Sequence, residues 1–145
     1  MQRGHDVLDQ LKDRCRRDHA AWVNGDASGY ALPDDGSIMG AVGGHSRGGA
    51  ETAHRQRAVA AQWKTGAGHV EFLNGGLSGD MAWLVFIERA MVVFAGDPDG
   101  AERRWDLRVT EIFRREGEAW ERVHRHADPL VEVRPLGEVA ALLDE

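Results

Sequence analysis

The segment from Met81 to Phe94 is apolar at both of its alternating positions, which limits how this chain can fold. One parity holds Ala82, Leu84, Phe86 and Val92, and the other holds Trp83, Val85, Ile87 and Val93. Successive side chains of a strand point to opposite faces, so a strand with one face in water alternates apolar and polar residues. We therefore predict a strand covered on both faces, by helices on one and by a second copy of the chain on the other.

The hydrophobic period changes along the chain at about His69. Before it, apolar residues recur at helical spacing and predict helices over residues 5–24 and from Ala50 to Lys64, with a short helix or turn over 27–32. After it, runs rich in Val, Ile, Phe and Trp alternate with the turn signals "DPDG" and "REGE". This predicts at least four antiparallel strands, followed by a short terminal helix in "PLGEVAALLDE".

The two predicted long helices differ in their inner faces. Leu8, Leu11, Cys15 and Trp22 form an apolar stripe on the first, so we interpret Cys15 as a core residue. The better face of the second helix is half polar, because it carries Thr52 and Gln56 beside Val59 and Trp63. That composition is typical of a helix that borders a cavity. The glycine-rich "MGAVGGHSRGGAE" before it predicts a connecting loop.

Length and charge exclude several classes of protein. The 145 residues predict one domain, residues 1–145. A net charge of −6 argues against a nucleic-acid partner, since binding phosphates requires clustered Lys and Arg. We expect no membrane association, because no apolar run is long enough to span a bilayer and "MQRGHDVLDQ" lacks the core of a signal peptide. The single cysteine fits a reducing cytoplasm.

The most distinctive polar motif is "VHRHAD" on the last predicted strand. His124, His126 and Asp128 are two residues apart, so alternation places them on one face with Trp120, and we expect at least one histidine to line a cavity. Either histidine could act as a general acid or base, with Asp128 orienting it. In the alternative, both histidines only hold the hairpin through hydrogen bonds.

A metal site is a further alternative for this motif, because His-x-His on a strand is a known ligand spacing. Other histidines, at positions 45, 54 and 69, would have to converge on it. No fourth ligand is evident nearby, and we expect no metal.

Two acidic residues interrupt apolar patterns elsewhere. Glu88 lies within the apolar strand, and Asp18 lies near the middle of the first helix's stripe. A buried carboxylate needs a partner, so we expect an ion pair with an arginine ahead of a catalytic role. Arg108 shares a face with Thr110; it either grips a ligand carboxylate or belongs to a solvated or interface face. Two or three of the five tryptophans, at 22, 63, 83, 105 and 120, are expected to line a pocket for a flat, apolar ligand.

Two segments carry a family resemblance. "AAWVNGDASGY", followed by "GG…GG" before a helix, and "LRVTEIFRREGEAWERVHRHADPL" resemble SnoaL-like and DUF4440-type domains of the nuclear transport factor 2-like (NTF2-like) superfamily. The resemblance implies an α+β cone, a curved antiparallel sheet wrapped around N-terminal helices. Ketosteroid isomerases of this superfamily use carboxylates in an apolar pocket, a role open here to Glu88 or Asp18, with Tyr30 as donor to an oxyanion.

The resemblance leaves several functions open. One is cofactor-free acid–base chemistry, such as isomerisation, cyclisation or dehydration, on a small apolar, aromatic or polyketide-like metabolite. Others are a non-catalytic carrier in a biosynthetic cluster, such as a polyketide or enediyne cluster, and an oligomerisation domain. We expect a homodimer without cofactor or metal. The predicted catalytic residues are His124, His126, Asp128 and Glu88, and the predicted ligand-binding residues are Asp18, Trp22, Tyr30, Trp63, Trp83, Arg108, Thr110 and Trp120.

Overall fold

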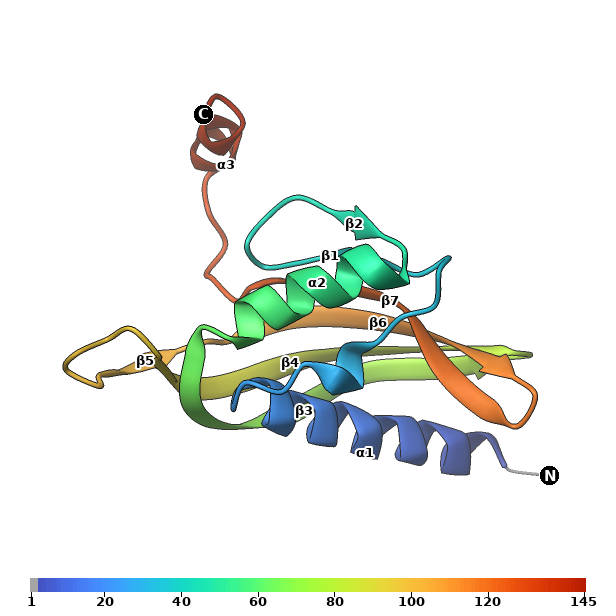
Figure 1. Ribbon diagram of the computed structural model, residues 1–145. Coiled ribbons are helices and arrows are strands. Elements are labelled where there is room, and N and C mark those ends of the chain that lie inside the picture. The colour runs from blue at the N-terminus through green and yellow to red at the C-terminus, as the bar shows by residue number, and fades with distance from the viewer. Residues whose placement is uncertain (1–2) are drawn as a thin grey trace.

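The computed structural model describes residues 3–145, with helices in the first part of the chain and long strands in the second (Figure 1). The first part comprises α1 (Gly4–Trp22), the 3-10 turn η1 (Ser28–Tyr30), β1 (Ser37–Met39), β2 (Ser46–Arg47) and α2 (Gly49–Ala60). The second comprises β3 (Trp63–Ser78), β4 (Met81–Phe94), β5 (Glu102–Arg104), β6 (Leu107–Glu116), β7 (Ala119–Pro129) and α3 (Leu136–Leu142). The predicted α+β class and the order of the long elements are confirmed.

One curved sheet holds all the strands, in the order β2-β1-β7-β6-β4-β3, with β5 paired to β4. The four long strands are antiparallel, as predicted, and the segments read as hairpin turns follow β4 and β6. The sheet is mixed because β1 pairs with β7 in parallel. Alternation did not reveal β1 and β2, which lie in and beside the glycine-rich segment and are only three and two residues long.

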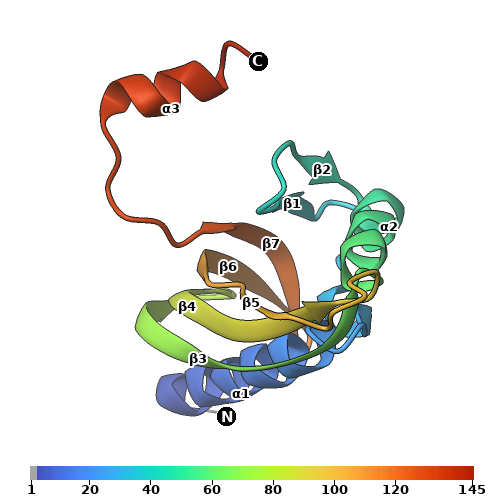
Figure 2. The same cartoon turned by 90° about the vertical axis from the view of Figure 1, so that its left-hand side faces the viewer.

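The sheet curls around the two long helices (Figure 2). The buried stripe of α1 packs on the inner face of the sheet: Val7, Leu11 and Cys15 join one core cluster, with Leu84, Phe86 and Phe113 among its other members. A second cluster contains Trp22, Trp63 and Val92. The two clusters together fill the interior of the cone.

The predicted second helix is four residues too long. It ends at Ala60 because the chain enters β3 at Trp63, whose indole packs against Trp22 and Phe94 at centroid distances of 5.5 and 5.1 Å. Tertiary packing of one aromatic side chain therefore overrides the helical pattern. The same contact starts the sheet six residues before His69.

The outer face of β4 is open in this chain. Trp83 is 40% exposed, and the side chains of Met81 and Met91 on the same face are similarly exposed. The predicted terminal helix is present as α3, which stands beyond β7 on an extended connection and buries none of its residues (Figures 1 and 2). Among residues 3–145, no helix combines the length and apolar character needed to cross a bilayer.

Candidate functional site

The inner face of β7 is set by a one-residue irregularity in its pairing with β6. Ile112 pairs with His124, whereas Phe113 pairs with Arg122, so Val123 is an extra residue on β7. Such a bulge reverses which parity faces the core. Arg122 is buried before the bulge, and Arg125 and Ala127 are buried after it. Simple alternation is therefore wrong beyond Val123, and the two histidines turn to the outer face.

The two arginines bind carboxylates from three other elements. Arg125 donates to both oxygens of Glu88 on β4, at 2.7 and 2.9 Å, and to Glu111 on β6 at 2.9 Å. Arg122 lies 3.0 Å from Glu111 and donates to Asp18 on α1 at 3.0 Å. The predicted ion pairing of Asp18 and Glu88 with arginines is confirmed. We call these five residues the buried ion network.

The network is closely balanced in charge. Arg14 lies 3.6 Å from Asp18, so three guanidinium groups face three carboxylates. Burial alone would raise the pKa of Glu88, but Arg125, together with His19 and Arg122, outweighs it and holds that pKa below the usual 4.5. Glu88 is therefore a stable carboxylate at neutral pH. A general acid, by contrast, requires a raised pKa.

Uncharged side chains complete the surroundings of the network. Tyr30 lies with its ring 4.8 Å from each of the Arg122 and Arg125 guanidinium carbons. Its hydroxyl is buried without a hydrogen-bond partner, and burial raises its pKa well above 10.0. The Cys15 thiol donates to Glu111 at 3.3 Å, and burial raises the pKa of that thiol, so it stays protonated. This matches its interpretation as a core residue.

His19 joins α1 to the network and was not among the predicted site residues. Its Nε2 lies 3.1 Å from the Arg89 carbonyl oxygen, so this nitrogen carries a proton and donates. Its Nδ1 lies 3.7 Å from Glu88 and makes no hydrogen bond. The buried stripe of α1 thus contains a polar contact at His19, between Cys15 and Trp22.

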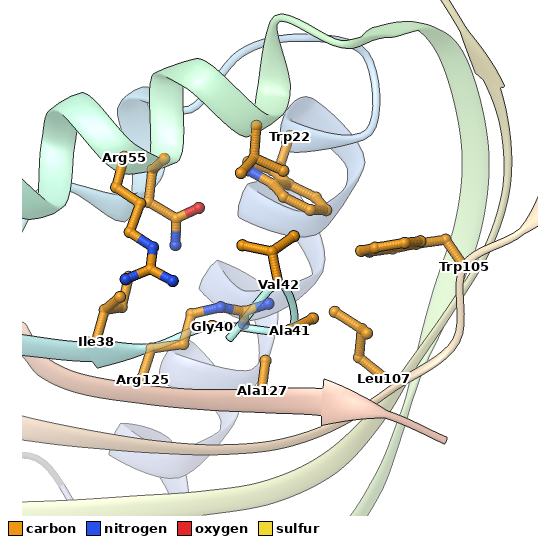
Figure 3. A pocket seen from close by; sticks show the side chains of 12 residues that line it. Trp22, Ile38, Gly40, Ala41, Val42, Arg55, Trp105, Leu107, Arg125 and Ala127 are labelled. Atoms are coloured by element: carbon orange, nitrogen blue, oxygen red, sulfur yellow. The ribbon is translucent and has the colours of Figure 1, made fainter. Parts of the chain in front are cut away.

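A pocket opens where α2, the loop after β1 and the inner face of β7 meet; we call it the mouth pocket (Figure 3). It encloses about 390 Å³ of empty space, its opening included. Its polar lining comes from Trp22, Arg55, Gln56 and Arg125. Its walls are otherwise apolar and come mainly from Ile38, Val42, Val59, Trp105, Leu107 and Ala127. The prediction that α2 borders a cavity is confirmed by Gln56 and Val59.

Two indole nitrogens from the lining of the mouth pocket are unpaired. Trp22 is only 4% exposed, and its Nε1 has no hydrogen-bond partner. The Nε1 of Trp105 is likewise buried and unpaired. A buried N–H without an acceptor is costly and rare in proteins. Both tryptophans that line the mouth pocket therefore carry an unsatisfied donor.

The predicted site residues divide among four places. Asp18, Tyr30 and Glu88 lie in or beside the ion network, and Trp22 lines the mouth pocket. Trp63 and Trp120 pack against the core clusters. The rest lie on the outer face, namely Trp83, Arg108, Thr110, His124, His126 and Asp128.

The outer-face polar residues pair mainly with one another. His124 Nδ1 lies 2.8 Å from the Ser37 hydroxyl, and Arg108 donates to Asp128 at 2.7 Å. Burial lowers the pKa of His124, and His126 lies 3.8 Å from Asp128. These residues share no cavity with the ion network. Among residues 3–145, no three His, Cys, Asp or Glu side chains are grouped as a metal site requires.

The prediction missed Arg55, Arg122, Arg125 and Glu111 as site residues. A one-residue bulge has no signature in composition, so sequence alternation assigned Arg125 to the wrong face. Glu111 carried the signal that marked Glu88, a lone carboxylate between Val109 and Phe113 on one parity. Applying the same rule to Glu111 would have identified all three carboxylates of the network from sequence.

Comparisons with known proteins resolve the fold. No protein-family model matches the sequence, and no curated protein sequence does either. A proposed dehydratase of the NTF2-like family from Streptomyces avermitilis superimposes with a TM-score of 0.77 at 16% identity, covering 90% of this chain and 100% of that one. An NTF2-like superfamily protein from Salmonella enterica gives 0.74 at 15% identity over 92% and 97%.

The association domain of C. elegans CaMKII is also similar, with a TM-score of 0.58 at 14% identity over 86% of this chain and 93% of that one. Two of these neighbours are described differently, one as a proposed dehydratase and one as an association domain, so the likeness shows the fold alone. The SnoaL-like or DUF4440-type subdivision stays a prediction. The chain has the NTF2-like α+β cone fold.

Proposed function

We propose that this protein binds a small, largely apolar molecule in the mouth pocket and holds it without transforming it. The observation that carries the proposal is the buried, unpaired Nε1 of Trp22 in a pocket whose walls are mostly apolar. Ligand pockets combine these two features, apolar walls for affinity and a few placed polar groups for orientation. The proposal requires no cofactor.

Acid–base catalysis is less well supported than binding. The role predicted for His124, His126, Asp128 and Glu88 stays a prediction, but the three β7 residues lie outside the cone and Glu88 is held by Arg125. A general base must reach the proton it removes. The dehydratase description of one structural neighbour does not decide the matter, because a fold shared at 16% identity hosts many functions.

The binding proposal is tested by filling the pocket. Ala127 lies in its wall and is 3% exposed, so Ala127→Leu places a larger side chain where the ligand would lie. Ala58→Leu, on the exposed side of α2, is the matched control. A panel of single-ring apolar fragments is titrated into each protein, and the Trp22 indole N–H signal is followed by NMR, assigned through Trp22→Phe.

We expect fragments to move the Trp22 signal in the wild type and in Ala58→Leu, with at least tenfold weaker binding in Ala127→Leu. Circular dichroism checks that both variants keep the fold. The proposal is wrong if no fragment moves the Trp22 signal, or if Ala127→Leu binds as well as the wild type.

A second candidate function is self-association through the outer face of the sheet. The observation that favours it is the exposed apolar side chain of Trp83, with Met81 and Met91 on the same strand face. Some structural neighbours are described as association domains. Pairing two copies through this face would form the homodimer that the sequence predicts, and it is compatible with ligand binding on the opposite face.

A further inference from the structure

The charges around the mouth pocket are unequal, and this asymmetry indicates which ligands fit. Arg125 is neutralised by Glu88 and Glu111 behind it. Arg55, on α2, forms no ion pair within residues 3–145. No acidic side chain lines the pocket. The pocket wall therefore carries one uncompensated positive charge.

The hydrogen bonds of Arg55 keep its guanidinium at the pocket. It donates to the Ser46 hydroxyl at 3.1 Å and to the carbonyl oxygen of Gly43. Both acceptors are uncharged and belong to the β1–β2 region, whose Ala41 and Val42 also line the pocket. These contacts fix the position of the Arg55 guanidinium and leave its charge unpaired. An arginine has five N–H donors, so some of them remain available to a ligand.

Trp22 provides an independent donor in the same pocket. Its N–H is unpaired although the side chain is almost completely buried. Figure 3 shows the Trp22 ring and the Arg55 guanidinium projecting into one pocket from opposite ends of its upper wall. A ligand oxygen that accepts from the indole would remove the penalty of the unpaired group.

We propose that the ligand of the mouth pocket is a small monocarboxylate with an apolar body about one ring in size. Its carboxylate binds Arg55, and its body lies beside the Trp22 ring and against Val59, Leu107 and Ala127. This inference rests on the proposed function and specifies its ligand class. Guanidinium is the side chain best suited to a carboxylate, because its planar N–H pairs match the two oxygens.

Other ligand charges fit less well. A cation would find no carboxylate in the lining and would face Arg55. A dianionic phosphate would bring a second negative charge that has no free cation to meet it, since Arg125 is already paired. The empty space of about 390 Å³ includes the open mouth of the pocket, so the room left for the apolar body of a ligand is small.

The test uses two probes of nearly equal shape, phenylacetate and phenylacetamide. Each is titrated into the full chain at pH 7, with the Trp22 indole N–H signal as readout. We expect phenylacetate to bind about 10–100-fold more tightly, the range of a charge-assisted hydrogen bond. We also expect the difference to shrink at high salt, because part of it is electrostatic.

Three variants locate the effect. Arg55→Gln should remove the preference for phenylacetate and leave phenylacetamide binding within about twofold. Arg55→Lys should keep part of the preference, since it keeps the charge and loses the planar geometry. Arg57→Gln is the matched control, because Arg57 lies on the same helix with an exposed side chain outside the pocket, and it should behave as the wild type.

The outcomes separate the ligand class from the function. Equal binding of the two probes, or an unchanged preference in Arg55→Gln, overturns the carboxylate inference while pocket binding stands. If neither probe nor any fragment of the apolar panel moves the Trp22 signal, the proposed function is wrong and the inference falls with it. If Arg57→Gln also loses the preference for phenylacetate, the preference comes from general surface charge, and the carboxylate inference is overturned.

Discussion

Arg125 joins carboxylates from two neighbouring strands in a place where none of the three groups reaches water. Glu88 and Glu111 are 1% and 0% exposed, and Arg125 is 4% exposed. Moving such charges out of water is expensive, so the attraction within the network largely offsets the cost of burying it. The network is therefore weak evidence for extra stability. Removing only one partner lowers stability strongly, because it leaves a buried charge without a counter-ion.

We expect Arg125→Met to lower the free energy of unfolding by about 3–5 kcal/mol, the range for breaking a buried ion pair from one side. Glu88 loses both of its short contacts and keeps only His19 at 3.7 Å. The matched control is Arg108→Met, which breaks the exposed pair with Asp128 and should cost about 0–1 kcal/mol. Urea unfolding followed by circular dichroism measures both.

A double variant separates the ion pair from simple packing. Adding Glu88→Leu to Arg125→Met should recover part of the lost stability, since the unpaired carboxylate is gone. If Glu88→Leu lowers the free energy of unfolding of Arg125→Met further instead of restoring part of it, Glu88 and Arg125 are not coupled through their charges.

At the scale of elements, β3 and β4 approach each other closely over most of their length. A Cβ at Gly68 would lie 1.9 Å from the carbonyl oxygen of Arg89, which is backbone and cannot rotate away. Gly68 pairs with Ala90 next to Arg89. Because glycine has no side chain, β3 and β4 can pair this closely at Gly68.

Gly68→Ala is expected to destabilise the protein by about 1–3 kcal/mol, on the scale of a backbone shift forced by overpacking. Gly96→Ala is the control, because a Cβ there meets no atom within 4 Å and Gly96 lies beyond the end of β4. Thermal unfolding of the two variants compares them. Equal melting temperatures for Gly68→Ala and the wild type would contradict the close approach.

The fold was largely predictable from the sequence, and the site was only partly so. The hydrophobic period, which changes near His69, shows which residues of each helix or strand face the core. It depends only on residues that are close together in the sequence, so it can be read from the sequence alone. The mouth pocket depends on Arg55 and Arg125, which are 70 positions apart and are brought together only by the register of β7. One of its walls is formed by residues 40–42 of the glycine-rich segment, which has no hydrophobic period. Asp18 and Glu88 were recognised because each breaks a local pattern.

For the molecule as a whole, two apolar surfaces remain in contact with water. One is the outer face of the sheet around Trp83, and the other is α3, whose Leu136 is 85% exposed, as is Leu143 directly after the helix. An isolated helix of seven residues is not stable in water, so its apolar face needs a cover. A second copy placed on the outer face would supply apolar surface for both, and the arrangement would be symmetric.

We expect the purified protein to sediment at about twice 16.0 kDa at micromolar concentration. Trp83→Glu should shift it to a monomer, because a charge in the centre of an apolar interface is left without a partner. Val42→Glu, at an exposed apolar position near the mouth pocket, is the control and should remain dimeric. Analytical ultracentrifugation decides, and a wild-type monomer would contradict the proposed association.

The extra residue at Val123 has a consequence for comparing sequences that share this fold. The letters His-x-His-x-Asp can be matched between two chains without a gap while the side chains they denote occupy opposite sides of the sheet. An alignment of β7 therefore has to be anchored separately on each half of the strand, with a gap allowed at the bulge. Without that gap, residues that line the cone in one protein are equated with residues that face solvent in the other. Functional transfer by motif then places the imidazoles at the interior positions that, in this chain, the guanidinium groups occupy.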